Sequence, residues 1–226
     1  MPAVVVISNP RVGAELGHLG TWLDRQGFAV DRRTRDDILP ADCADDAELL
    51  VILGSTWTMT RTMDAPEDPP QAAAAIHAEE DVVRRRMTQQ RPILGICFGG
   101  QLLSHALGGE VRRQPAAHVA WEVPDTDIPE LRHPWMLLHE DAFTLPPGAE
   151  LLAEADHAPV AYRVGLAWGV QFHPEVDAAI LERMFVDIHY DPAASRPYVD
   201  EAHLRAQDLE RQSHALFDRF WAEVGA

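Results

Sequence analysis

One cysteine in this sequence lies in a setting that suits a nucleophile. Cys97 stands in Gly95-Ile96-Cys97-Phe98-Gly99, where a short apolar run ends in glycines and a helical pattern begins. A strand, a sharp turn and a helix present the side chain at the turn, and the flanking glycines remove steric clashes there. The start of a helix favours a thiolate, which is the form of cysteine that attacks carbonyl carbon. We therefore interpret Cys97 as a candidate catalytic nucleophile.

A later segment, Gly169-Val170-Gln171-Phe172-His173-Pro174-Glu175, contains a possible base for that nucleophile. His173 and Glu175 are two residues apart, so an extended chain points both side chains to the same side. Pro174 between them favours extended backbone and disfavours a helix. We predict that His173 accepts the proton of Cys97 and later gives it to a leaving amine, while Glu175 orients the imidazole.

With these two motifs, the chain resembles the class I glutamine amidotransferases, the triad type with Cys, His and Glu. Gly95 through Gln101 matches that family's G-[IV]-C-x-G-x-Q pattern, and Gly169 through Glu175 matches its G-x-Q-F-H-P-E pattern. The resemblance covers about residues 1–186, and it implies the catalytic set Cys97, His173 and Glu175.

The tetrahedral intermediate of such a reaction needs donors for its oxyanion. One is expected to be the backbone N–H of Phe98, directly after the nucleophile. The resemblance implies a second from the loop after the third strand, at Gly54 or Ser55. Relatives often have Gly-Gly-Pro or Gly-Ser-Pro there, whereas this chain has Gly54-Ser55-Thr56-Trp57 without the proline. An ordinary turn explains this segment equally well.

The resemblance also implies a set of substrate-binding residues, namely Gly99, Gln101, Trp121, His139 and Asp141. Relatives often have His-Gly-Asp where this chain has His139-Glu140-Asp141, so a backbone contact at the glycine position is not assured by the motif. Core packing accounts for Trp121 equally well.

The composition limits which binding partners and cellular location we expect. The chain has 226 residues, 36 acidic against 19 basic ones and a formal charge of −17, and every basic residue is arginine. We expect neither nucleic acid nor a membrane surface as partner, because both are negatively charged and attract basic proteins. We also expect no membrane-spanning helix, because no segment reaches the ~20 apolar residues that one requires. Two cysteines make a disulfide framework implausible. A free thiol and the lack of a basic leader favour the cytoplasm.

Apolar runs and glycine or proline stops alternate along the chain, as in a layered α/β fold. Strands are expected at 4–8, 28–32, 49–53, 93–96, 110–113, 120–123, 136–139, 151–154, 160–163 and 166–172. Helices are expected at 15–26, 71–90, 101–107, 177–189 and 201–224, with a loop at 58–70 and a proline-containing linker at 191–197.

The expected fold is α/β, a flavodoxin-like three-layer sandwich with a mainly parallel central sheet. We predict one amidotransferase domain over residues 1–190 and a C-terminal helical extension over 191–226 packed on the same domain. Gly54, Cys97 and His173 fall at predicted strand ends, and the carboxyl ends of the strands are where such sheets place their reactive crevice.

No metal or cofactor is expected. The 11 histidines are scattered and form no H-E-x-x-H pattern, and the chain has no C-x-x-C. Neither a dinucleotide-binding G-x-G-x-x-G nor a G-x-x-x-x-G-K-[ST] phosphate loop occurs in a suitable place.

The leading expectation is a glutaminase that forms a cysteinyl thioester, gives glutamate and ammonia, and leaves the ammonia acceptor to a separate synthetase or ligase. A first alternative is a hydrolase of γ-glutamyl peptides or conjugates with the same triad. A second is a partner-dependent regulatory or binding subunit. The oligomeric state and the acceptor cannot be read from these residues.

Overall fold

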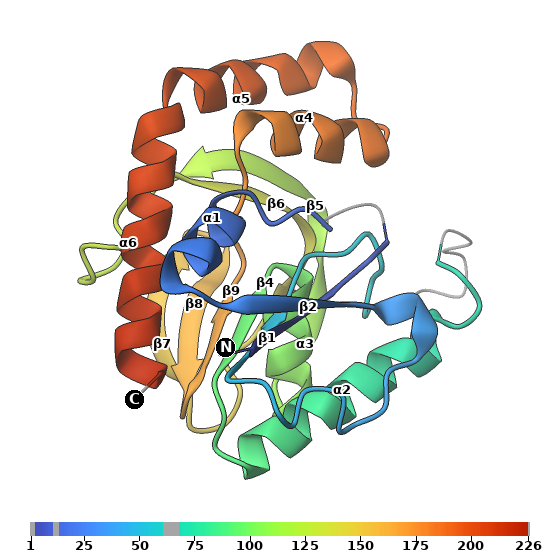
Figure 1. The fold of residues 1–226 in the computed structure, drawn as a ribbon. Helices are drawn as coiled ribbons and strands as arrows, with labels where there is room; N and C mark the ends of the chain where they lie inside the picture. Colours follow the sequence, from blue (N-terminus) through green and yellow to red (C-terminus); the bar gives the residue numbers. More distant parts are fainter. Residues whose placement is uncertain (1–2, 11–13, 61–67, 226) are drawn as a thin grey trace.

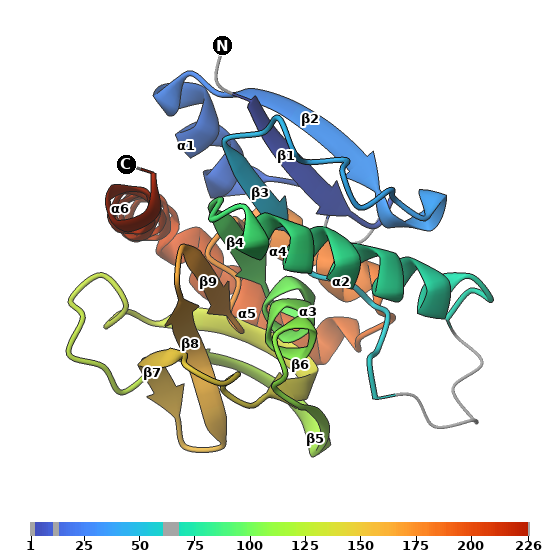
Figure 2. The same cartoon turned by 90° about the horizontal axis from the view of Figure 1, so that it is seen from below.

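A seven-stranded sheet forms the centre of the computed structural model, which describes residues 3–10, 14–60 and 68–225 (Figures 1 and 2). Its strand order is β2-β1-β3-β4-β9-β8-β7. The first five of these run parallel, and β8 and β7 are added antiparallel. The strands are β1 (Ala3–Ser8), β2 (Ala29–Thr34), β3 (Leu49–Ile52), β4 (Ile93–Ile96), β7 (Glu150–Ala155), β8 (Ala158–Val164) and β9 (Ala167–Val170). The predicted α/β class with a mainly parallel, flavodoxin-like sheet is confirmed.

Helices cover both faces of this sheet because its strands are apolar on both sides. In β1, Val4 and Val6 belong to the cluster beneath α1 (Gly17–Gln26) and α6 (Ala206–Val224). Their neighbours Val5 and Ile7 belong to the cluster beneath α2 (Ala72–Thr88) and α3 (Phe98–Ala106). Alternate residues of a strand face opposite sides, so one run of four valine and isoleucine residues supplies two hydrophobic cores and produces three layers.

A second sheet of two antiparallel strands, β5 (Val111–Glu122) and β6 (Trp135–Phe143), lies beside the central one (Figure 2). The two short strands predicted at 110–113 and 120–123 are one long strand in the structure. Its register shifts between Arg113 and His118, around Pro115. Proline cannot donate a hydrogen bond to the ladder, so it is accommodated at a bulge.

The C-terminal region corrects two predictions. The segment 191–197 is not a linker, because α5 (Pro192–Leu204) begins there, with Pro192 in its first turn and the Asp191 carboxylate accepting from the N–H groups of Ala193 and Ala194. Proline at the first helical position loses no helical hydrogen bond, and aspartate is a favoured cap. The single helix predicted at 201–224 is in fact the end of α5 followed by α6, with a break at Arg205.

Two further helical segments are present among the described residues. A 3₁₀ turn (Arg35–Asp37) follows β2, and α4 (Ala178–Asp187) packs against α5 and β6 in a third apolar cluster (Figure 1). Part of α6 packs against α1, where Phe217 contacts Trp22. Residues 61–67, within the loop predicted at 58–70, lie outside the described residues.

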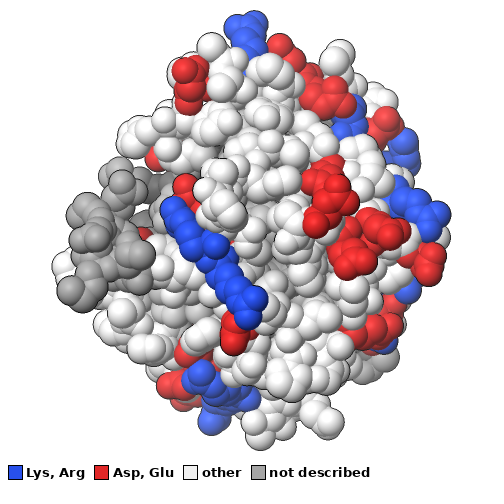
Figure 3. Space-filling view, turned by 180° about the vertical axis from the view of Figure 1, so that it is seen from behind, with Lys and Arg blue, Asp and Glu red and all other residues white. Residues whose placement is uncertain are grey.

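Acidic and basic side chains are dispersed over the face shown in Figure 3, in small groups of both signs. Many of the described arginines pair with carboxylates at the surface, as Arg25 does with Asp218 and Arg183 with Glu15. Exposed pairs of this kind contribute only about 0–1 kcal/mol each to stability. Among the described helices, none combines the length and apolar character that crossing a membrane requires.

Candidate active site

Cys97 stands at a strained turn between β4 and α3. Its φ is 53° and its ψ is −107°, a conformation that residues other than glycine rarely adopt. A Cβ placed on Gly95 would lie 2.4 Å from the Gly99 carbonyl oxygen, and one on Gly99 would lie 2.0 Å from the Ile52 carbonyl oxygen. The two glycines of the motif are therefore required by contacts with neighbouring backbone. The helix predicted at 101–107 begins earlier, at Phe98, because Gly99 and Gly100 fit within its first turn.

His173 and Glu175 follow β9 and are held against β6. The backbone N–H of His173 donates to the Met136 carbonyl oxygen at 2.9 Å. The His173 Nδ1 atom lies 2.7 Å from the Glu175 Oε1 atom, and both side chains are buried. A carboxylate can only accept, so Nδ1 carries the proton and donates it. Glu175 thus fixes the imidazole with Nε2 directed elsewhere.

The nucleophile and the histidine come together beside Gly54. A Cβ on Gly54 would lie 3.2 Å from the His173 Cε1 atom and 3.8 Å from the Cys97 Cβ atom. The Nε2 atom of His173 is buried and has no hydrogen-bond partner among the described residues. The Cys97 Sγ atom lies 3.8 Å from the Leu138 carbonyl oxygen and 3.6 Å from the amide Nε2 of Gln171. Three segments that are distant in sequence therefore meet at the carboxyl ends of β3, β4 and β9.

The electrostatics of this site favour a charged imidazole. Burial opposes protonation of His173, but the charges of Glu175 and Cys97 outweigh it and raise the pKa of His173 well above its ordinary value of 6.5. An imidazolium between a carboxylate and a thiolate is the arrangement that activates a cysteine near neutral pH.

Replacing Glu175 by glutamine is expected to lower the His173 pKa by about 1–3 units, because an opposite charge in direct contact is removed. The His173 pKa in the folded chain lies above 6.5, so protonation stabilises the fold fully below pH 6.5, and this contribution is lost as the pH rises through the folded-state pKa. The variant should lose part of that pH dependence. NMR titration of His173 and unfolding midpoints across pH would measure both effects, and an unchanged His173 pKa would contradict the assigned contact.

The expected oxyanion donors lie around the same turn. Phe98 is the first residue of α3, so its N–H is one of those that have no partner within the helix. The turn at Gly54 and Ser55 is fixed by its surroundings: the Gly54 carbonyl oxygen accepts from Arg35, and the Ser55 hydroxyl donates to the Asn9 side chain. The Ser55 hydroxyl also accepts from the N–H of Trp57. This network holds the turn without the proline that relatives often have.

Two of the predicted substrate-binding side chains make internal contacts here. The amide Nε2 of Gln101 donates to the Asp141 carbonyl oxygen at 2.8 Å, and the Asp141 carboxylate accepts from the hydroxyl groups of Thr58 and Thr60 at 2.5 and 2.7 Å. Together these bonds attach the 58–60 segment and α3 to the end of β6. That Gln101 and Asp141 also bind substrate stays a prediction.

Trp121 and His139 lie on neighbouring strands but contact different parts of the molecule. Trp121 packs against α5, where its indole N–H donates to the Tyr198 carbonyl oxygen and the Arg205 guanidinium lies 5.2 Å from its ring centre. His139 follows Leu138, whose carbonyl faces Cys97, and its ring lies beside those of His118 and His157. Trp121 therefore contributes to packing, and that Trp121 and His139 also bind substrate stays a prediction.

Sequence reasoning missed Arg35, a fully buried arginine beneath the site. It pairs with buried Glu79 at 2.9 Å and donates to the side chain of Asn9 at 2.6 Å and to the carbonyl oxygens of Leu53 and Gly54 at 3.2 Å. Its guanidinium carbon lies 4.6 Å from the ring centre of Phe98. Arg35 therefore connects both strand ends that border Cys97. One arginine among many in a polar stretch carries no sequence signal of such burial.

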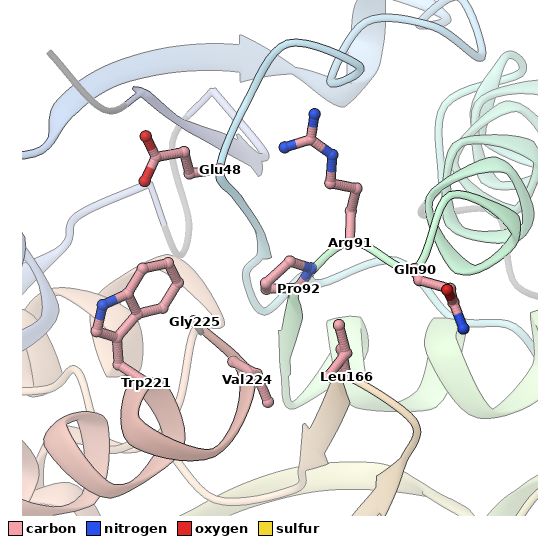
Figure 4. A pocket seen from close by; sticks show the side chains of 8 residues that line it. All are labelled: Glu48, Gln90, Arg91, Pro92, Leu166, Trp221, Val224 and Gly225. Carbon is pink, nitrogen blue, oxygen red and sulfur yellow. The ribbon is translucent and has the colours of Figure 1, made fainter.

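A cavity lies at the end of the sheet opposite to Cys97 (Figure 4). Glu48, Pro92 and Leu166, which line it, immediately precede the parallel strands β3, β4 and β9. The cavity is thus at the amino ends of these strands, away from Cys97. Trp221 and Val224 of α6 close its other side. It has no part in the arrangement of Cys97, His173 and Glu175.

The segment that contains the candidate site is similar to known proteins. The family model for glutamine amidotransferase class-I matches residues 65–187, which contain Cys97, His173 and Glu175. The chain is 37% identical over 91 residues to a GMP synthase [glutamine-hydrolyzing] of Bdellovibrio bacteriovorus, a match that covers 38% of this chain and 18% of that relative. The chain thus spans under a fifth of that protein's length.

Two solved structures share the fold across nearly the whole chain. A glutamine amidotransferase from Thermotoga maritima is 20% identical and has a TM-score of 0.78, with 97% of each chain covered. A glutamine amido transferase from Methylobacillus flagellatus is 25% identical and has a TM-score of 0.74, with 99% of this chain and 95% of that one covered. The family match over more than half of its residues, together with these likenesses, shows that the chain belongs to the class I glutamine amidotransferases.

Proposed function

We propose that the protein hydrolyses the side-chain amide of glutamine, with Cys97 as nucleophile, His173 as general base and acid, and Glu175 as the group that orients His173. The observation that carries the proposal is the convergence of a strained cysteine and a buried His–Glu pair beside Gly54. Membership of the amidotransferase family supports glutamine as the substrate.

The reaction would proceed in two steps. The Cys97 thiolate attacks the amide carbon, and the tetrahedral oxyanion accepts hydrogen bonds from the Phe98 N–H and from the N–H of Gly54 or Ser55. His173 gives its proton to the departing nitrogen, so that ammonia leaves and a γ-glutamyl thioester remains. Water then attacks the thioester with His173 as its base, which releases glutamate and restores the thiol.

Binding of glutamine is assigned to the residues around this turn. We propose that Gly99, Gln101, Asp141 and the backbone of the segment 138–140 contribute to the substrate site. The contacts among Gln101, Asp141 and Thr58 support this, because they make one unit of α3, β6 and the 58–60 segment next to Cys97. His139 and Trp121 are the weaker members of the predicted set, because their side chains already contact other groups.

The ammonia is proposed to pass to an acceptor handled by a separate synthetase. The relative from Bdellovibrio bacteriovorus is named as a glutamine-hydrolysing synthase, and this chain matches only a small part of it. The sequence contains no G-x-x-x-x-G-K-[ST] phosphate loop with which to activate an acceptor. The name of that relative is what supports a division of labour between a glutaminase and a synthetase.

The test is ammonia release from glutamine by the purified chain, compared with release of the amino acid from γ-glutamyl dipeptides. An electrophilic glutamine analogue, followed by peptide mass spectrometry, would report whether Cys97 is the atom that reacts. Preferred turnover of glutamine and labelling of Cys97 are expected. Fast cleavage of γ-glutamyl dipeptides with negligible turnover of glutamine would overturn the proposal in favour of a γ-glutamyl hydrolase. Labelling that needs an added synthetase would indicate a partner-dependent subunit.

A further inference from the structure

Three histidines and a glutamate gather between the two sheets, beside the candidate active site but outside the triad. His118 and Glu122 lie on β5, His139 on β6, and His157 in the turn between β7 and β8. The His118 and His157 rings stack with their centres 4.0 Å apart, and the His139 ring centre lies 5.5 and 5.4 Å from theirs. Side chains from three elements therefore converge on one point.

Donor atoms of His118, Glu122 and His157 lie close enough to share one metal ion, and His139 adjoins them through His157. His118 Nε2 lies 2.9 Å from Glu122 Oε2, and His157 Nε2 lies 3.4 Å from His139 Nε2. One ligand atom from each of His118, Glu122 and His157 lies within 4.8 Å of the other two. A tetrahedral ion with bonds of about 2.0–2.1 Å to nitrogen needs ligand atoms about 3.3–3.4 Å apart. The 3.4 Å between the His157 and His139 Nε2 atoms meets that spacing, and the 2.9 Å between His118 Nε2 and Glu122 Oε2 is shorter than it.

The protonation of the cluster also suits a metal. The Asp141 carbonyl oxygen lies 2.9 Å from His139 Nδ1 and can only accept, so Nδ1 carries the proton and Nε2, which faces His157, has a free lone pair. A histidine ligand held in this way by a backbone carbonyl is the usual outer-shell arrangement of metal sites.

We propose that His118, Glu122, His139 and His157 form a binding site for one divalent transition-metal ion, with Zn²⁺ as the best match to three imidazoles and one carboxylate. The ion would replace the proton between His118 and Glu122 and would link the β7–β8 turn to the β5–β6 sheet. It would be a structural ion, because all four positions are filled by protein atoms.

The proposed metal site would also stabilise the part of β6 that lies next to Cys97. Leu138, next to His139, presents its carbonyl oxygen to Cys97 Sγ, and Asp141 receives hydrogen bonds from both His139 and Gln101. A metal that fixes His139 would fix the strand that faces the nucleophile. The sequence alone predicts no metal, because the ligands are spread from residue 118 to residue 157 and form no compact spacing pattern.

The test uses the full chain, freed of metal by a chelator and titrated with Zn²⁺ by calorimetry, and with Co²⁺ as a visible-absorption probe of tetrahedral ligation. We expect one ion per chain and a rise of the unfolding temperature with Zn²⁺. His118→Ala and His157→Ala should each weaken binding by at least about 10–100-fold. Both positions are partly exposed, so the variants are expected to fold, and circular dichroism would verify this.

Two controls make the outcome decisive. His203→Ala changes an exposed histidine of α5, and its Zn²⁺ affinity should equal that of the unaltered chain. Cys97→Ala removes the thiol that could bind Zn²⁺ on its own, and binding should persist in it. The proposal is overturned if the unaltered chain binds no Zn²⁺, if His118→Ala and His157→Ala bind it as tightly as the unaltered chain, or if binding disappears in Cys97→Ala. Because binding and stability are the readouts, the result is independent of whether glutamine is the substrate.

Discussion

Cys97→Ala is expected to reduce ammonia release from glutamine by at least about 10⁴-fold, because no other group in the site can form the thioester. The folded structure should survive the change. The Cβ atom remains, the strained turn is imposed by the surrounding backbone, and the contacts of the sulfur with Leu138 and Gln171 are long ones. Steady-state kinetics and chemical unfolding on the same preparation would separate loss of chemistry from loss of fold.

Cys43→Ala is the matched control, since Cys43 is the second of the chain's two cysteines. It lies partly buried against the apolar cluster beneath α2, and burial raises the pKa of its thiol, which keeps it unreactive. The Cys43→Ala variant should turn over glutamine at the unaltered rate, and an electrophilic glutamine analogue should still react with its remaining cysteine, Cys97. The assignment of the nucleophile would be contradicted if Cys97→Ala turned over glutamine normally. It would also be contradicted if Cys43→Ala lost turnover while Cys97→Ala kept it.

Sequence was sufficient wherever a feature is local. The turn at Cys97 is encoded by glycines that neighbouring backbone makes obligatory, and the alternation of His173, Pro174 and Glu175 encodes an ion pair within one short extended segment. The parallel strands β1, β3, β4 and β9 could be predicted for the same reason, because each is a short apolar run. These signals depend on residues within a few positions of one another.

Sequence was insufficient where contacts join distant segments. The buried position of Arg35 depends on Glu79, Asn9 and the end of β3, none of which is near it in the chain. The histidine cluster likewise consists of residues that are distant from one another in the sequence. The prediction for the C-terminal helices is wrong for a different reason: proline in 191–197 indicates a linker, whereas the Asp191 cap makes Pro192 the start of a helix. Proline signals a helix start as well as an interruption, and the cap decides between them.

Arg35→Ala is expected to destabilise the protein by about 3–5 kcal/mol, because it leaves the Glu79 carboxylate buried without its partner. Burial raises the pKa of Glu79 and Arg35 opposes that rise, so the variant's carboxyl should take up a proton at higher pH than in the unaltered chain. Denaturant unfolding would measure the loss. Arg33→Ala is a matched control two residues earlier, on β2, where the pair with Asp31 is exposed and should contribute less than about 1 kcal/mol.

The double variant Arg35→Met with Glu79→Leu distinguishes two roles of Arg35. If the ion pair were its whole contribution, an apolar replacement of both partners would restore stability. Arg35 also donates to Asn9 and to the carbonyl oxygens of Leu53 and Gly54, so the double variant leaves these acceptors without their donor. We therefore expect only partial recovery of stability, and a turnover number that stays low because the Gly54 turn beside His173 is no longer held. Full recovery of both quantities would show that Arg35 serves the fold but does not position the site.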